Sequence, residues 1–177
     1  MKQTRHLLIA LALGTMLTSC GASVSTATVT GPAAYVDPYI GSGGHGHVFV
    51  GASVPFGAIQ AGPQNIHKGW DWCSGYHHSD SIVIGFAHTH LSGTGCTDMG
   101  DVQIMPYTGE LRSKRGRQED IGGSCSSYYS HDNESVSPGY YSLKMDNGVR
   151  IEMTASTRTA LHRITYPEAE GRRLLIN

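Results

Sequence analysis

Glycine is the feature that most restricts what this chain can fold into. Of the 177 residues, 23 are glycine and 7 are proline. This is about twice the ordinary share of glycine in globular proteins. Glycine weakens helices and permits tight turns and bulges. The sequence also shows neither a repeat of fixed period nor an amphipathic run of helical length. The composition therefore favours many short strands joined by turns.

Strand signals occur in segments 81–90, 101–107, 140–145, 149–156, 160–166 and 173–176. In the first segment, alternation predicts one shared face for Ile82, Ile84, Phe86, His88 and His90. The second is expected to stop at Pro106. Asn147-Gly148 separates the next pair and is typical of a hairpin turn, because these residues accept positive φ. The expected fold is all-β, an antiparallel β-sandwich.

The first 19 residues have the pattern of an export signal. Lys2 and Arg5 precede the apolar residues 7–13, a stretch too short to span a bilayer. Leu17-Thr18-Ser19 then leads to Cys20, as in bacterial lipoproteins that are cut before a cysteine that receives lipid. An ordinary secretory signal with an incidental cysteine is the alternative.

This pattern predicts an exported protein of the cell envelope, lipid-anchored through Cys20 to a membrane, at the outer membrane or the periplasmic face. Residues 20–33 are small and polar and are expected to form a flexible tether. Residues 34–177 would then form the folded domain.

Charge and cysteine content further narrow the kinds of protein and site that the chain can represent. Thirteen Lys and Arg against fourteen Asp and Glu leave no basic excess for a nucleic-acid partner. The mixed-charge stretch within 111–127 reads as a solvated loop. Cys73, Cys96 and Cys125 remain after Cys20 is set aside, and none has the spacing of a zinc site. Export permits one disulfide, whose pair the sequence does not choose, and buried free thiols are the alternative.

Three clusters could carry chemistry. The first is the glycine-rich segment 41–47 with His45 and His47, and the second is Trp70-Asp71-Trp72-Cys73. Indoles pack on the C–H faces of sugars and a carboxylate accepts from sugar hydroxyls, so the second cluster suits carbohydrate; core tryptophans are the alternative. The third cluster is segment 88–101, which begins His88-Thr89-His90.

The histidines of the first and third clusters could together form a zinc or copper centre. Histidines that hydrogen-bond beside a pocket are the favoured interpretation, so no metal ligand is assigned here. A metal-dependent hydrolase built on His45, His47, His88 and His90 stays a minor alternative.

As an ordered string, these motifs resemble the amino-terminal domain of glycoside hydrolase family 92. The resemblance runs from Tyr35 to the last residue and rests on YVDPYIG, GGHGH, VPFG, WDWCSGYH, GFAHTHLSGTGC and PGYY. That family comprises calcium-dependent exo-acting α-mannosidases that invert configuration. The resemblance implies a β-sandwich packed against a carboxy-terminal (α/α)6 barrel, with mannose-containing glycans as substrate.

In the family, the catalytic carboxylates and much of the calcium site come from the barrel. The sequence ends before such a barrel, inside an apparent strand, so we assign no catalytic residue and expect the chain alone to be inactive. The resemblance implies substrate-binding roles for Trp70, Asp71, Trp72, Cys73, His88, His90, Gly93 and Gly95. The alternative function is a free-standing carbohydrate-binding lipoprotein.

Overall fold

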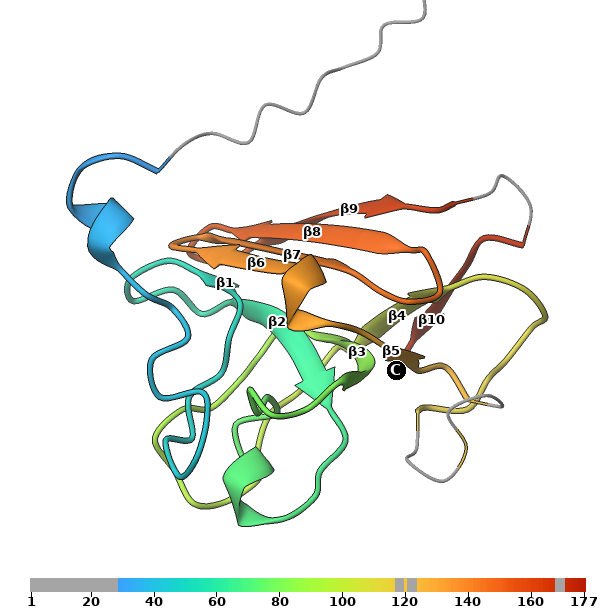
Figure 1. Cartoon of the computed structure of the whole chain (residues 1–177), viewed down its shortest axis with the longest axis horizontal. Helices are drawn as coiled ribbons and strands as arrows, with labels where there is room; N and C mark the ends of the chain where they lie inside the picture. Colours follow the sequence, from blue (N-terminus) through green and yellow to red (C-terminus); the bar gives the residue numbers. More distant parts are fainter. Residues whose placement is uncertain (1–28, 117–119, 121–123, 168–170) are drawn as a thin grey trace, which may run out of the picture.

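The computed structural model describes residues 29–116, 120, 124–167 and 171–177, and it confirms an all-β antiparallel fold. Two sheets form two layers (Figure 1). The first sheet has the order β1 (Ala52–Ser53), β2 (Gln60–Asn65), β3 (Ile82–Ala87), β4 (Ile104–Tyr107) and β10 (Arg173–Ile176), and β5 (Ser127–Tyr128) also pairs with β3. The second has the order β6 (Glu134–Ser137), β7 (Tyr140–Lys144), β8 (Arg150–Ala155) and β9 (Ala160–Thr165).

Short 3-10 turns accompany the strands: η1 (Gly31–Tyr35), η2 (Trp70–Trp72) and η4 (His131–Asn133). The export signal and Cys20 lie outside the described residues, as does most of the expected tether, whose last residues enter η1. Across the part of the chain that the structure describes, no helix is long and apolar enough to cross a membrane.

The core lies between the two sheets. Val83 and Phe86 of β3 face Tyr141, Leu143 and other apolar side chains of β7 and β8, all of them almost fully buried. β1 and β2 lie against β8, which closes the sandwich. Burying each large apolar side chain contributes about 1.5–3 kcal/mol, so this interface is the main source of stability.

The predicted hairpin is confirmed, with residues 146–148 in its loop. β7 and β8 pair from Tyr140↔Thr154 to Lys144↔Arg150. The amide of Gly148 donates to the Met145 carbonyl at 2.9 Å, and Gly148 alone of the turn residues has positive φ, at 84°. This is a type I turn closed by a glycine bulge rather than a two-residue turn.

The predicted alternation of segment 81–90 is wrong within β3. The register with β2 skips one residue, because Gln64 pairs with Gly85 while Asn65 pairs with Val83. This bulge places Val83 and Phe86 in the core cluster and leaves Ile82 and Ile84, also buried, outside it. Gly85 permits the bulge because the Gln103 side chain occupies the space that a Cβ would need.

Two further expectations are corrected. β4 continues through Pro106, which pairs with Leu174 of β10. The proline is tolerated because β3 pairs with β4 at Ile104, so the missing N–H of Pro106 breaks no hydrogen bond between these two strands. The 111–127 stretch is not wholly solvated, since Gly116 and residues 124–127 are buried, with Gly116 against Ile84.

The segment that joins β2 to β3, residues 66–81, is held by buried polar groups. Tyr76 donates its hydroxyl to Glu134 of β6 at 3.0 Å, and Tyr141 donates to the same carboxylate at 2.7 Å. Burial, followed by the charge of Glu134, raises the pKa of both tyrosines, which therefore remain protonated donors. His131 also contacts this carboxylate, at 2.7 Å.

Replacing Glu134 by leucine is expected to destabilise the fold strongly. The substitution removes the carboxylate that accepts from two buried hydroxyls, and a buried hydroxyl that loses its acceptor costs about 1–3 kcal/mol. Urea denaturation should show a lower midpoint with an unchanged slope. Glu110→Leu, at an exposed position, is the control and should change the midpoint little. Equal midpoints for the two variants would contradict this account.

Candidate functional site

Three loops that are distant in sequence meet beyond the first sheet, on the side away from β6–β9 (Figure 1). They are the glycine-rich segment 41–49, η2, and the 92–96 turn. The Gly93 amide donates to the His47 carbonyl at 2.8 Å, and the Phe49 amide donates to the Ser92 hydroxyl at 3.2 Å. The first predicted cluster is therefore tied to the third.

Trp70 lies at the centre of these loops. Its side chain is 57% exposed, and the His47 ring packs edge-on against it with centroids 4.2 Å apart. Gly95 approaches the other part of the indole so closely that a Cβ there would lie 2.6 Å from Trp70 Nε1. An exposed apolar face is thus held in position by a buried histidine and a glycine.

Asp71 projects beside this indole. His45 Nδ1 lies 2.6 Å and His47 Nε2 3.4 Å from its Oδ1 atom. The hydrogen bond with His45, the largest effect, lowers the pKa of Asp71, so the group is ionised at neutral pH. No described residue hydrogen-bonds its second oxygen. We call Trp70, Asp71, His45, His47 and Gly95 the Trp70 rim.

Trp72 and Cys73 follow the rim residues Trp70 and Asp71 in the chain and pack against neighbouring loops. The Trp72 indole donates to Asp80 Oδ2 at 2.8 Å and stacks on His77 with centroids 4.3 Å apart. Cys73 is buried, and its thiol donates to the Thr94 carbonyl at 2.8 Å. Both residues have packing contacts in the structure, and their predicted contact with substrate stays a prediction.

The two predicted histidines of segment 88–90 occupy different environments. His90 is buried, stacks on Phe49 at 5.2 Å, and hydrogen-bonds the Gln60 carbonyl at 2.8 Å. Burial lowers its pKa. His88 instead contacts the Val102 carbonyl and, through Nε2, lies 2.9 Å from His162 Nε2 on β9. None of its described contacts reaches Trp70.

His88 therefore links the two sheets through His162, and its predicted role beside the substrate stays a prediction. Its Nδ1 donates to the Val102 carbonyl, so its Nε2 accepts the proton of His162 Nε2. The four-histidine metal centre is not formed, because His45 and His47 contact Asp71 while His88 and His90 have other partners. No group of three or more possible metal ligands occurs among the described residues.

Sequence reasoning did not find the roles of three histidines. The pairing of His45 and His47 with Asp71 is signalled only by the His-Gly-His spacing, which equally suits a metal. His162 has no signal, since an isolated histidine in a strand says nothing about its partner across the sandwich.

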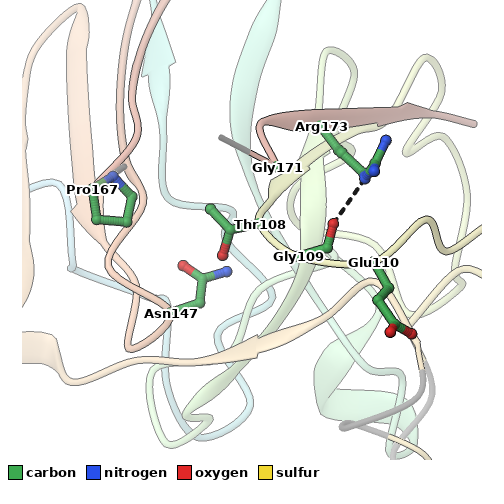
Figure 2. Close-up of a pocket in the computed structure, with 7 residues that line it drawn as sticks. All are labelled: Thr108, Gly109, Glu110, Asn147, Pro167, Gly171 and Arg173. Carbon is green, nitrogen blue, oxygen red and sulfur yellow. Dashed lines mark hydrogen bonds between the residues drawn. The ribbon is translucent and has the colours of Figure 1, made fainter. Parts of the chain in front are cut away.

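A separate hollow of about 570 Å³ opens elsewhere, near the turn of the β7–β8 hairpin (Figure 2). Asn147, Thr108 and Glu110 line it, and Arg173 donates from Nε to the Gly109 carbonyl at 2.8 Å across its edge. No residue of the Trp70 rim lines this hollow.

Comparison with known proteins identifies the family of this chain. Residues 35–177 match the family model of the glycosyl hydrolase family 92 N-terminal domain. The chain belongs to glycosyl hydrolase family 92. The resemblance inferred from the ordered motifs is thereby confirmed, and the two-layer β-structure is that of the family 92 amino-terminal domain.

The proteins that are similar to this chain include two solved structures and one curated protein. A family 92 α-mannosidase from Bacteroides thetaiotaomicron, solved with mannoimidazole, is 42% identical with a TM-score of 0.77, over 81% of this chain and 19% of that chain. Another family 92 glycosyl hydrolase is 26% identical with a TM-score of 0.70, over 81% and 20%. An uncharacterized secreted glycosidase from Arthroderma benhamiae is 32% identical over 75% of this chain and 17% of its own length. The chain thus spans about a fifth of these relatives.

Replacing Gly95 by alanine is expected to displace the Trp70 indole from this family 92 domain's rim. The new Cβ would lie 2.6 Å from Trp70 Nε1, and the exposed ring is free to move outward. We expect a change in tryptophan emission and stronger quenching by acrylamide, with little loss of stability. Gly43→Ala is the matched control, because its Cβ would meet only His78 at 3.6 Å. Identical quenching in both variants would contradict the placement of Trp70.

His162 should make stability fall in mild acid. Burial, and then the charge of His88, lowers the pKa of His162 to about 4, whereas an unfolded histidine titrates near 6.5. The unfolded chain binds more protons between these values, so this stabilisation is complete above about pH 6.5 and is lost as pH falls toward 4. The buried His90 acts in the same direction.

His162→Gln should flatten the pH dependence of the unfolding free energy between pH 4 and 6.5, measured by urea denaturation at each pH. The slope removed is at most about 1.4 kcal/mol per pH unit and smaller for a half-buried ring. His67→Gln, at an exposed position, is the control. An unchanged slope in the His162 variant would show that its ring titrates alike in both states.

Proposed function

We propose that the intact protein is an exported, calcium-dependent, inverting exo-α-mannosidase and that this domain supplies one wall of the pocket for a terminal α-mannose. The observation that carries the proposal is the Trp70 rim, where an exposed indole lies beside an ionised carboxylate held by two histidines. The family membership gives the reaction class, glycoside hydrolysis.

The rim has the chemistry that a pyranose requires. The exposed face of Trp70 would pack on the C–H surface of the ring, and the second oxygen of Asp71 would accept from one or two hydroxyls. Gly93 has open space where a Cβ would stand and lets a sugar approach the backbone of the turn, whereas Gly95 leaves that space to the Trp70 indole. Trp72, Cys73 and His90 would act indirectly, by holding this wall rigid.

Relatives support mannose as the sugar. The similar Bacteroides thetaiotaomicron enzyme is an α-mannosidase solved with mannoimidazole, and the similar fungal protein is a secreted glycosidase. The first supports mannose-containing glycans as the substrate and the second supports export. The lipid anchor at Cys20 rests on the sequence pattern alone.

We assign no catalytic carboxylate to this domain. An inverting glycosidase needs an acid and a base about 6.5–9.5 Å apart around the scissile bond. Asp71 is hydrogen-bonded by two imidazoles, which suits hydroxyl binding better than proton transfer. We propose that both carboxylates come from the carboxy-terminal helical barrel, so this chain alone would be inactive.

The same division applies to calcium. Calcium takes six to eight oxygen ligands, whereas the Trp70 rim offers one carboxylate that already contacts two histidines. The described residues do not fit a calcium ion by themselves. For the intact enzyme we propose that the helical barrel supplies most of the ligands, and no step here is derived through the ion.

Several exposed apolar side chains support a partner domain. Phe56 is fully exposed and holds a positive φ of 59°, a conformation that is costly for a bulky residue. Tyr35, Ile40 and Met99 are also at least half exposed. We propose that the helical barrel covers these side chains.

Trp70→Ala in the full-length protein tests this function. We expect kcat/KM for mannose release from α-mannosides to fall about 10- to 100-fold, since losing one aromatic contact of about 1.5–3 kcal/mol corresponds to that factor. Tyr128→Ala removes a half-exposed aromatic from β5 and should leave the rate unchanged. Equal rates in both variants would exclude Trp70 from the pocket.

Calorimetry with the chain alone distinguishes the proposed mannosidase from the alternative, a carbohydrate-binding lipoprotein. Half of a pocket should bind mannose weakly and release none from glycans. Tight binding by this chain without any hydrolysis, even by the full-length protein, would favour a carbohydrate-binding lipoprotein.

A further inference from the structure

Cys73 and Cys96 lie in two different loops that contact each other beside Trp70. The Cys73 thiol donates to the Thr94 carbonyl at 2.8 Å, two residues before Cys96. The Thr94 hydroxyl donates to the Cys96 carbonyl at 3.3 Å, so the chain folds back and keeps Cys96 close to Thr94. The structure thereby places the Cys73 thiol against the turn that carries Cys96, 23 positions away in the sequence, and Cys73, Cys96 and Cys125 are all free thiols.

Cys125 has a different environment. It is buried in the core, its amide donates to the Lys114 carbonyl, and its thiol lies 3.6 Å from the Arg112 carbonyl. None of the contacts described for it involves the loops of the Trp70 rim. The three cysteines therefore divide into a neighbouring pair and one core thiol.

We propose that Cys73 and Cys96 form a disulfide after export, which covalently joins η2 to the 92–96 turn. The pKa of Cys73 supports their proximity, because burial raises it first and the neighbouring Cys96 raises it further. The proposal depends on the proposed function only for export, which brings the chain to a compartment where disulfides persist.

Exposure sets the order of the chemistry. Cys96 is exposed and Cys73 is 2% exposed, so the Cys96 thiolate attacks first. Its target is the disulfide of an external oxidant, such as glutathione disulfide, and one thiol of the oxidant leaves. The Cys73 thiolate then attacks the Cys96 sulfur and expels the second thiol. Two protein thiols lose two electrons and two protons, and one oxidant disulfide becomes two thiols.

The cross-link would fix the geometry of the Trp70 rim. Gly95 precedes Cys96 and lies against the indole, while Cys73 directly follows η2. With the bond formed, the loop that carries Trp70 cannot move away from the turn that contacts it. The disulfide is thus a positioning device for a binding surface made of loops.

Peptide mapping of the native protein tests the proposal. Trypsin cleaves after Lys68 and Arg112 and at no residue between them, so one peptide carries both Cys73 and Cys96, while Cys125 lies in peptide 118–144. The folded protein is equilibrated with glutathione disulfide, alkylated with iodoacetamide in denaturant, and digested. We expect peptide 69–112 to lose both alkyl groups and two hydrogen masses, and peptide 118–144 to remain alkylated.

Chymotrypsin distinguishes the linkage, because it cuts between the two cysteines at Tyr76 and Phe86 and should release two joined fragments. Cys125→Ser should give the same result, whereas Cys73→Ser and Cys96→Ser should abolish the linkage. The native protein carries the decisive measurement, so a variant that fails to fold does not affect it. Full alkylation of peptide 69–112, or any fragment joined through Cys125, would overturn the proposal.

Discussion

The Trp70 rim depends on the buried polar groups that hold the 66–81 segment on the sandwich. Glu134 of the second sheet binds Tyr76, and Asp80 accepts from the Trp72 indole and from the backbone amides of Ser81 and Ile82. Lys68 pairs with the same buried Asp80 at 3.0 Å. Tyr76 also anchors the segment in the core, because its ring belongs to the buried apolar cluster. These hydrogen bonds convert a glycine-rich connection into a rigid support for Trp70.

Histidines serve several physical purposes around this support. His45 and His47 orient the Asp71 carboxylate, and His90 fills a buried place beside Phe49. His88 and His162 instead join the two sheets through a neutral hydrogen bond that requires one protonated and one bare nitrogen. These five histidines therefore all have hydrogen-bonding partners within the domain, and a metal centre is not needed to account for them.

Much of the second sheet could be predicted from the sequence because its strands follow local rules. The segments 140–145 and 149–156 flank the turn signal Asn147-Gly148, and in the structure Ile151 and Met153 of the second segment are buried in the core. The first sheet was harder. β2 has the sequence Gln-Ala-Gly-Pro-Gln-Asn, which has little strand propensity, and it forms because Gly62 and Gly51 let two backbones approach closely.

The sequence by itself determined the class of fold, the family, and the presence of a Trp-Asp-Trp motif, because these are written in local patterns and in the order of motifs. Only the tertiary structure decided which residues meet. The fold leaves Trp70 exposed and anchors Trp72 on Asp80, although only Asp71 lies between them in the sequence. It moved His88 to the sheet interface and brought Cys73 beside the 92–96 turn. Such partnerships depend on distances across the fold, and no local pattern encodes them.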